Sequence, residues 1–167
     1  MKRGWKGFGL VIVVLCGVSA GCGYSTRRPF PTGIKTVYVE MLESKEFRRD
    51  LEFELTESLV KRIEMDTPYR IADKQVADTV FSGEILEVQQ RAMGNDFHTG
   101  RPREVAATIA MRYRWKDLRT GEMLVERDRF TWTTTYIPPV GETFGKGMVR
   151  GLDGMAERIV ETMETKW

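Results

Sequence analysis

Alternating apolar and polar positions dominate the middle of this 167-residue chain and predict β-strands. The most regular stretch is residues 105–116. One face of that strand would carry Val105, Ala107, Ile109, Met111, Tyr113 and Trp115, and the other Ala106, Thr108, Ala110, Arg112, Arg114 and Lys116. Weaker alternation predicts further strands over residues 34–42, 69–72, 79–89 and 123–136. Gly83, inside one of them, indicates a bulge or a close approach of two backbones.

Two other stretches follow the helical period. Residues 46–64 carry an apolar stripe with a spacing of four, formed by Phe47, Leu51, Leu55, Leu59 and Ile63, and Ser44 is the predicted N-cap. Residues 144–164 carry a second stripe of Met148, Leu152, Met155, Ile159 and Met163. Three glycines interrupt this second helix, at Gly147, Gly151 and Gly154, and each costs about 1 kcal/mol relative to alanine.

These elements predict an α+β fold. Prolines and glycines mark a linker at residues 25–31 and a loop at residues 92–103, and the Arg119–Gly121 segment fits a tight hairpin. The order is then β-α-β-β-β-β-α. Two helices packed on one face of a mixed four- to five-stranded sheet would form an α/β sandwich and leave the opposite face open.

The hairpin fixes an expected register between the last two strands. It sets Arg114 opposite Glu126 and Arg112 opposite Asp128, so that the charges on the open face are paired. The same register places Arg127 and Arg129 on the core face, which only a bulge in the last strand would avoid.

The same register also predicts where two aromatic residues of the last strand lie. Phe130 and Trp132 fall opposite Ala110 and Thr108, on the open face, where exposed aromatic side chains are typical anchors of a partner interface. The alternative is that the C-terminal helix covers them.

The N-terminal 25 residues have the pattern of an export signal. Three cations (Lys2, Arg3 and Lys6) precede an apolar run over residues 8–18, and small residues lead to Cys22. The Ser19–Cys22 segment resembles a bacterial lipobox, in which the cysteine is lipidated, although Ser19 stands where leucine is usual. The alternative is a secreted protein cleaved near Ala20. We expect a signal peptide at residues 1–21, a lipidated N-terminus and linker at residues 22–33, and a single domain at residues 34–167.

Composition argues against several function classes. The chain holds 26 basic and 24 acidic residues, three of the basic ones in the leader, so the mature charge is nearly balanced and gives no reason to expect nucleic acid as a partner. Cys22 is the one cysteine left after cleavage, so no internal disulfide is expected. His98 is the sole histidine. We see no catalytic constellation, metal-ligand spacing or cofactor motif, and predict a protein that is not an enzyme.

Several motifs together resemble the LPS-assembly lipoprotein family (LptE). The chain carries Cys22-Gly23-Tyr24, then Val37-Tyr38-Val39, then Leu55-Thr56-Glu57-Ser58-Leu59, and finally Ala77-Asp78 followed by Gly83 and Ile85. These motifs are structural and span most of the mature chain.

The resemblance implies a role in lipopolysaccharide export. Members of the LptE family plug and scaffold a β-barrel translocon of the outer membrane and can bind lipopolysaccharide. Gly23 after the cysteine, rather than aspartate, favours the outer membrane, with the domain on the periplasmic side. The alternative is a lipid-anchored envelope lipoprotein that binds amphiphiles or other envelope proteins without a barrel partner.

The same expectation selects candidate site residues. Arg91 precedes the loop at residues 92–103, and Arg101 and Arg103 lie in it. All three would hold lipopolysaccharide phosphates, with Phe97 against acyl chains; an ordinary surface loop is the alternative. Arg112 and Arg114 are candidates for a partner interface with Phe130 and Trp132, against the reading that they only pair with acids. Cys22 is the expected lipid attachment site.

Overall fold

The fold is known from a computed structural model that describes residues 30–46, 50–138, 141 and 143–164. One sheet and two helices make up this part of the chain. The expected leader, the lipidation site Cys22 and the stripe residue Phe47 lie outside the described residues. Predictions that concern them therefore stay predictions.

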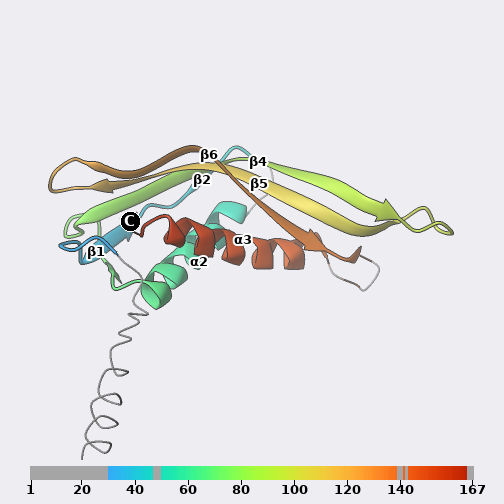
Figure 1. The fold of residues 1–167 in the computed structure, drawn as a ribbon, viewed down its shortest axis with the longest axis horizontal. Helices are drawn as coiled ribbons and strands as arrows, with labels where there is room; N and C mark the ends of the chain where they lie inside the picture. The colour runs from blue at the N-terminus through green and yellow to red at the C-terminus, as the bar shows by residue number, and fades with distance from the viewer. Residues whose placement is uncertain (1–29, 47–49, 139–140, 142, 165–167) are drawn as a thin grey trace, which may run out of the picture.

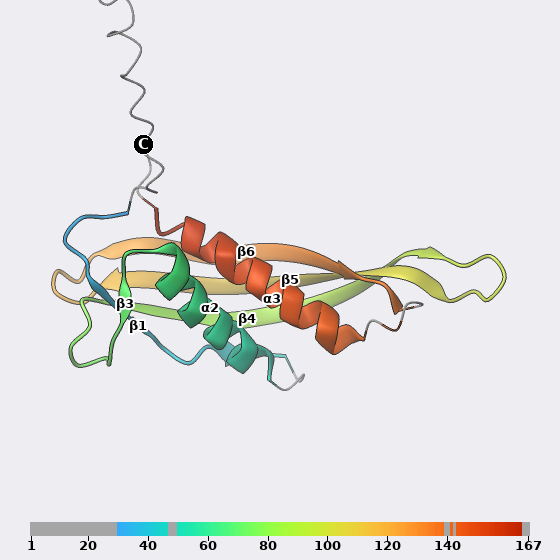
Figure 2. The same cartoon turned by 90° about the horizontal axis from the view of Figure 1, so that it is seen from below.

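The molecule has two layers. Figure 1 shows the sheet above and both helices, α2 (Leu51–Asp66) and α3 (Phe144–Glu161), packed beneath it, and Figure 2 shows the helices from below. No described element covers the upper face. The predicted α+β class, with two helices on one face of a mixed sheet, is confirmed.

The sheet order is β3-β1-β4-β5-β6, and a further short strand, β2, also pairs with β4. Three strands are short: β1 (Thr36–Val39), β2 (Glu43–Ser44) and β3 (Arg70–Ile71). β1 and β2 both run parallel to β4, whereas β5 is antiparallel to both of its neighbours, β4 and β6. The sheet has six strands, one more than the sequence predicts, because the two-residue β2 carries no alternation.

The first helix begins later than predicted. Its buried face is formed by Leu51, Leu55, Leu59 and Ile63, as expected. The predicted N-cap Ser44 is wrong: this residue lies in β2, and its hydroxyl accepts a hydrogen bond from the Glu46 backbone N–H at 3.1 Å. The residue before the helix is Asp50, whose φ of 75° turns the chain sharply into it.

Strands β4 (Thr79–Asn95) and β5 (Pro102–Asp117) form a hairpin that is longer than predicted. The loop predicted over residues 92–103 is wrong, because the strands pair as far as Asn95 and Pro102 and only residues 96–101 turn. We call residues 91–103 the far half of this hairpin. The tip of the hairpin extends past both helices (Figure 1). Its side chains are exposed on both faces, so they carry no pattern of burial.

Gly83 allows the close approach predicted for it. An added Cβ would lie 2.9 Å from the Arg112 carbonyl oxygen and 3.1 Å from Cβ of Tyr113. The bulge of this strand falls nearby, between Ile85 and Glu87.

A bulge in β6 (Met123–Tyr136) corrects the predicted register. Arg114 does lie opposite Glu126, but beyond Tyr113 and Arg127 the pairing shifts by one residue, so that Phe130 lies opposite Met111 and Trp132 opposite Ile109. The predicted open-face position of Phe130 and Trp132 is therefore wrong: both share the face of the buried β5 residues, where the helices pack. The alternative, cover by the C-terminal helix, is the one observed.

The glycines of α3 explain how this helix fits against β6. An added Cβ would lie 2.7 Å from Tyr136 at Gly147, 2.5 Å from Thr134 at Gly151 and 3.1 Å from Trp132 at Gly154. The helix thus approaches the strand more closely than any side chain would permit. Glycine costs helix stability here but brings the two backbones together.

Aromatic residues fill the end of the core where the described chain begins. Phe30 packs edge-on against Tyr69 at 5.5 Å between ring centroids, and Tyr69 lies 5.8 Å from Trp115. The indole N–H of Trp115 donates to the Thr79 hydroxyl at 2.9 Å. The first described residue is therefore packed against the core.

Candidate functional site

Two surfaces hold the predicted site residues: the open face of the sheet and the far half of the β4–β5 hairpin. The open face follows from the alternation of β5. Its inward side chains meet the helices, so Arg112, Arg114 and Lys116 are left exposed on the other side.

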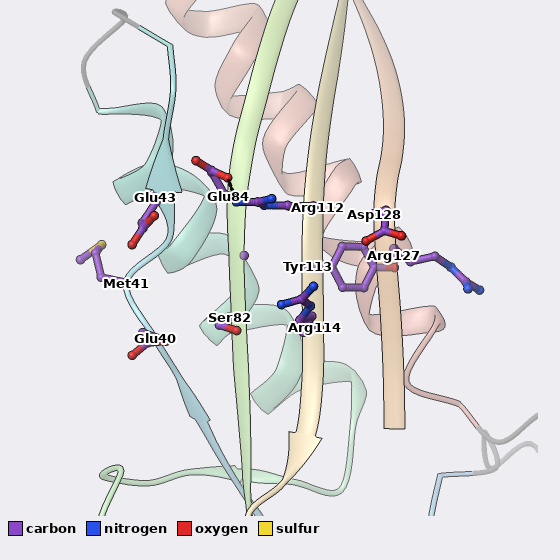
Figure 3. A pocket seen from close by; sticks show the side chains of 11 residues that line it. Glu40, Met41, Glu43, Ser82, Glu84, Arg112, Tyr113, Arg114, Arg127 and Asp128 are labelled. Carbon is purple, nitrogen blue, oxygen red and sulfur yellow. Dashed lines mark ion pairs between the residues drawn. The ribbon is translucent and has the colours of Figure 1, made fainter. Parts of the chain in front are cut away.

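A shallow hollow of about 290 Å³ crosses the open face (Figure 3). Ser82 and Gly83 of β4 form its floor because neither has a long side chain. Two acidic residues, Glu40 after β1 and Glu43 of β2, line one side, and Arg112 and Arg114 of β5 lie across β4 from them. Both signs of charge therefore meet in this hollow.

Glu84 is the most buried charged residue of the open face, with 9% of its surface exposed. Its carboxylate forms ion pairs with Arg112 at 2.6 Å and Lys45 at 3.5 Å. The predicted pair between Arg112 and Asp128 is wrong, since the bulge in β6 moves Asp128 out of register. The sequence analysis missed Glu84, although its position two residues after Ser82 on the polar side of β4 could have indicated it.

Two further ion pairs continue across the face. Arg114 binds Glu126 at 2.7 Å, as predicted. Arg129, which the bulge moves off the core face, pairs with Glu87 of β4, and this ion pair lowers the pKa of Glu87. The open face is thus a surface of matched charges. Surface ion pairs of this kind contribute little stability, about 0–1 kcal/mol each, but they give the face a fixed charge pattern.

The far half of the hairpin holds the three arginines predicted to bind a ligand. Arg91 lies on β4 opposite Ala106, Arg101 in the turn, and Arg103 on β5. Arg103 is 3.8 Å from Asp96. Among the described residues, neither Arg91 nor Arg101 has an ion-pair partner, so both guanidinium groups face solvent.

Asp96 holds the turn between these strands. Its carboxylate accepts hydrogen bonds from the backbone N–H of His98 at 3.0 Å and of Thr99 at 2.9 Å, and these bonds lower its pKa. Phe97 is 95% exposed and Met93 60% exposed beside it. These two side chains, with Arg103 and Glu104, line a hollow of about 550 Å³. The turn therefore presents cations and apolar side chains together.

The described residues offer no metal centre and no membrane-crossing helix. No three or more His, Cys, Asp or Glu side chains among them are arranged to hold a metal ion. Neither α2 nor α3 combines the length and apolar character needed to cross a bilayer.

Comparison with protein families identifies the chain. The family model for lipopolysaccharide assembly, LptE, matches residues 34–163. The protein belongs to the LptE family. The match covers the whole described sheet and both helices. A search of curated proteins found no significant match.

Solved structures share the fold at low sequence identity. The hypothetical protein CT253 from Chlamydia trachomatis has a TM-score of 0.55 at 12% identity, covering 77% of this chain and 96% of that one. A PelC dodecamer from Paraburkholderia phytofirmans gives 0.54 at 15% identity, covering 84% and 96%. Lipoprotein B from Nitrosomonas europaea, described as uncharacterized, gives 0.51 at 13% identity, covering 80% and 83%. At such identities the likeness concerns the fold alone.

The motifs that resemble the family have structural roles here. Val37 and Val39 of β1 are buried, as are Leu55 and Leu59 of α2. Asp78 accepts hydrogen bonds from the backbone N–H groups that precede and begin β1. These motif residues thus build the sheet and the first helix.

Proposed function

We propose that this LptE family member is a lipoprotein of the outer membrane, attached through lipidated Cys22, that plugs and scaffolds a β-barrel lipopolysaccharide translocon from the periplasmic side. The family match over residues 34–163 carries the proposal. In this proposal the protein acts by binding and positioning and has no catalytic role. The export signal and the cysteine at its end support the envelope location.

The open sheet face is the proposed contact with the barrel. It is uncovered, and its paired charges, Glu84 with Arg112 and Glu126 with Arg114, suit a polar partner surface such as the wall of an aqueous lumen. Phe130 and Trp132 are left out of this interface because they face the helices.

The far half of the β4–β5 hairpin is the proposed contact with lipopolysaccharide. Arg91, Arg101 and Arg103 would bind its phosphates, since guanidinium groups form strong charge-assisted bonds with phosphate. Exposed Phe97 and Met93 would meet its acyl chains. The hollow beside Phe97 also favours a second candidate, a lipid-anchored protein that binds amphiphiles without a barrel.

Two measurements separate these candidates. Gentle detergent extraction of the full-length protein should recover a β-barrel partner. Failure to recover one, with lipopolysaccharide binding intact, would support the second candidate instead.

Binding of purified lipopolysaccharide tests the hairpin. Changing Arg91, Arg101 and Arg103 together to alanine should weaken binding at least about tenfold, because three charge-assisted contacts are lost. The matched control changes three exposed cations outside the hairpin, Lys61, Arg70 and Lys146, to alanine and removes the same charge. Equal losses in both variants would show that net charge alone matters.

A further inference from the structure

One end of the sheet is formed where several strands begin or end side by side. The register pairs the beginning of β1 with the beginnings of β3 and β4, and the beginning of β4 with the end of β5, beside which β6 begins. The described chain also starts here, with Phe30 against Tyr69 (Figures 1 and 2). We call residues 30–36, 70–79 and 116–123 the Phe30 end.

Three apolar side chains of the Phe30 end are exposed to solvent. Val76 is 72% exposed, and Leu118 and Met123 are each 41% exposed. They lie on neighbouring turns, because the Leu118 backbone N–H donates to the Asp78 carbonyl oxygen at 2.8 Å. Met123 lies opposite Lys116, two residues before Leu118. Exposed apolar side chains that gather in this way indicate a surface for interaction.

Both turns are held by hydrogen bonds of their own. Between β5 and β6, the Asp117 carboxylate accepts from the backbone N–H of Arg119 at 2.7 Å and of Thr120 at 3.1 Å. Before β4, the Val76 backbone N–H donates to the Asp73 carbonyl oxygen at 3.0 Å. The apolar side chains are thus presented on backbone that is already ordered, so that binding costs little conformational entropy there.

The unpaired charge of the Phe30 end is positive on balance. Among the described residues, three exposed cations of this end have no ion-pair partner: Lys35, Arg70 and Lys116. Two exposed acids, Asp73 and Glu122, are unpaired as well. The other two acids of this end, Asp78 and Asp117, bind backbone N–H groups and Arg119. Residues 23–29 add two arginines and no acid. This balance favours contact with anionic headgroups.

The lipidated cysteine proposed above would keep the Phe30 end near a bilayer. Residues 22–29 join Cys22 to Phe30, and at no more than about 3.6 Å for each residue they span at most about 29 Å. The turn of the β4–β5 hairpin lies at the opposite end of the sheet (Figure 1). Of the two ends, the Phe30 end is therefore the one that a short tether holds close to a lipid surface.

We propose that the Phe30 end rests on the surface of the bilayer that holds the lipid anchor. Val76, Leu118 and Met123 would enter the interfacial region, and the unpaired cations would lie near anionic phospholipid headgroups. This inference rests on the proposed lipidation of Cys22 and adds to it a second contact with the membrane, which fixes how the domain is oriented.

Fluorescence quenching by lipid tests the contact. The lipidated full-length protein is reconstituted into vesicles of zwitterionic and anionic phospholipids, some with brominated acyl chains. Val76→Cys carries an environment-sensitive fluorophore, and Val149→Cys, at an exposed position of α3, is the matched control. We expect the label at position 76 to be quenched at least about twofold more than the label at position 149, because interfacial side chains meet the acyl chains. Equal quenching at the two positions, or none at position 76, would overturn the proposal.

Two pairs of variants separate the apolar and the charged contributions. With the label placed through Met123→Cys, Val76→Asp should reduce the quenching and Met41→Asp, at another exposed apolar position, should not. In vesicles rich in anionic lipid, Lys35→Gln with Lys116→Gln should reduce it more than Lys61→Gln with Lys146→Gln. Circular dichroism verifies that each variant is folded. Equal effects within both pairs would overturn the proposal.

Two further outcomes distinguish this proposal from its alternatives. A label at position 76 that is shielded only when a β-barrel partner is reconstituted as well would assign the Phe30 end to a protein contact and overturn the lipid contact. Flotation of the protein with the vesicles reports separately on the anchor. Protein that does not float would overturn the anchor and this inference together, whereas protein that floats without quenching at position 76 would overturn this inference alone.

Discussion

At the scale of single residues, Asp78 organises the place where two strands begin. Its carboxylate accepts hydrogen bonds from the N–H groups of Lys35 at 2.8 Å and Thr36 at 3.0 Å, and its own N–H donates to the Thr36 hydroxyl at 2.8 Å. The bond from Lys35 is the largest of the causes that lower the pKa of Asp78. The ionised carboxylate thus aligns β1 with β4.

Changing Asp78 to asparagine should lower the urea midpoint at pH 7, because an amide oxygen accepts these bonds less strongly. A lowered folded-state pKa gives stability that is present above the unfolded-state pKa, about 3.9, and is lost as the pH falls through the folded value. The difference in urea midpoint between the wild type and Asp78→Asn should therefore shrink below about pH 4. Asp73→Asn, which removes a carboxylate with no described hydrogen bond, is the control; a gap that does not change with pH would contradict the assignment.

Gly151 supports the contact between α3 and β6. Gly151→Ala should destabilise the protein by about 1–3 kcal/mol, since the new methyl group meets Thr134 at 2.5 Å and the helix must move. Gly145→Ala has nothing within 4 Å and should raise stability by up to about 1 kcal/mol. Chemical denaturation of both variants measures the difference. A stabilising Gly151→Ala would show that the close approach is unimportant.

At the scale of elements, the sequence predicts those whose faces differ in environment. The inward residues of β5 and the stripes of α2 and α3 alternate with polar ones because one side is buried. On the near side of the β6 bulge the predicted charge pairing is also correct, as Arg114 with Glu126 shows, whereas beyond the bulge Arg112 pairs with Glu84 instead of Asp128.

The errors occur where the environment of a residue leaves no mark in the alternation of apolar and polar positions. The bulge in β6 leaves no mark in composition, yet one extra residue reverses the face of everything after it, including Phe130 and Trp132. The far half of the hairpin is exposed on both sides, so its strands show no alternation and its glycine and proline suggest a loop. Glu84 was missed because ion pairing, rather than periodicity, keeps it near the core.

The far half of the hairpin should be dispensable for folding. Replacing residues 93–104 with a two-residue Asn-Gly turn joins Ala92 to Val105, which already lie opposite each other, and removes no core residue, so the melting temperature should change by only a few degrees. Lipopolysaccharide binding should fall as well, because Arg101, Arg103 and Phe97 are removed while Arg91 remains. Differential scanning calorimetry and a binding measurement on the same preparation check both outcomes. A protein that fails to fold would assign the hairpin a structural role instead.

At the scale of the whole molecule, the first described residue and the proposed ligand site lie at opposite ends. Phe30 packs against Tyr69, which in turn contacts Trp115, at one end, and the turn of the β4–β5 hairpin lies at the other (Figure 1). β5 alone, at 16 residues and about 3.3 Å each, accounts for about 50 Å of this separation. A protein held at one end can thus present the other far from its attachment point.

Replacing Cys22 with serine should release the protein from membranes, because the acyl chains that this proposal places there provide the attachment. The measurement is sedimentation of envelope fractions, with mass spectrometry of the mature N-terminus to detect the lipid. The fold should be unaffected, since the described domain begins at residue 30. Unchanged sedimentation after carbonate washing would rule out lipidation as the anchor.

The packing of Phe30 against Tyr69 has a mechanical consequence. If the protein is attached through Cys22 as proposed, a pulling force reaches the described domain at Phe30 and passes toward β1, which pairs in parallel with β3 and β4 on its two sides. A strand pulled along its own axis loads its hydrogen bonds together instead of opening them one after another. With that attachment, the end of the domain that holds Phe30 would resist the force in shear, while the turn of the β4–β5 hairpin at the other end would carry none of it.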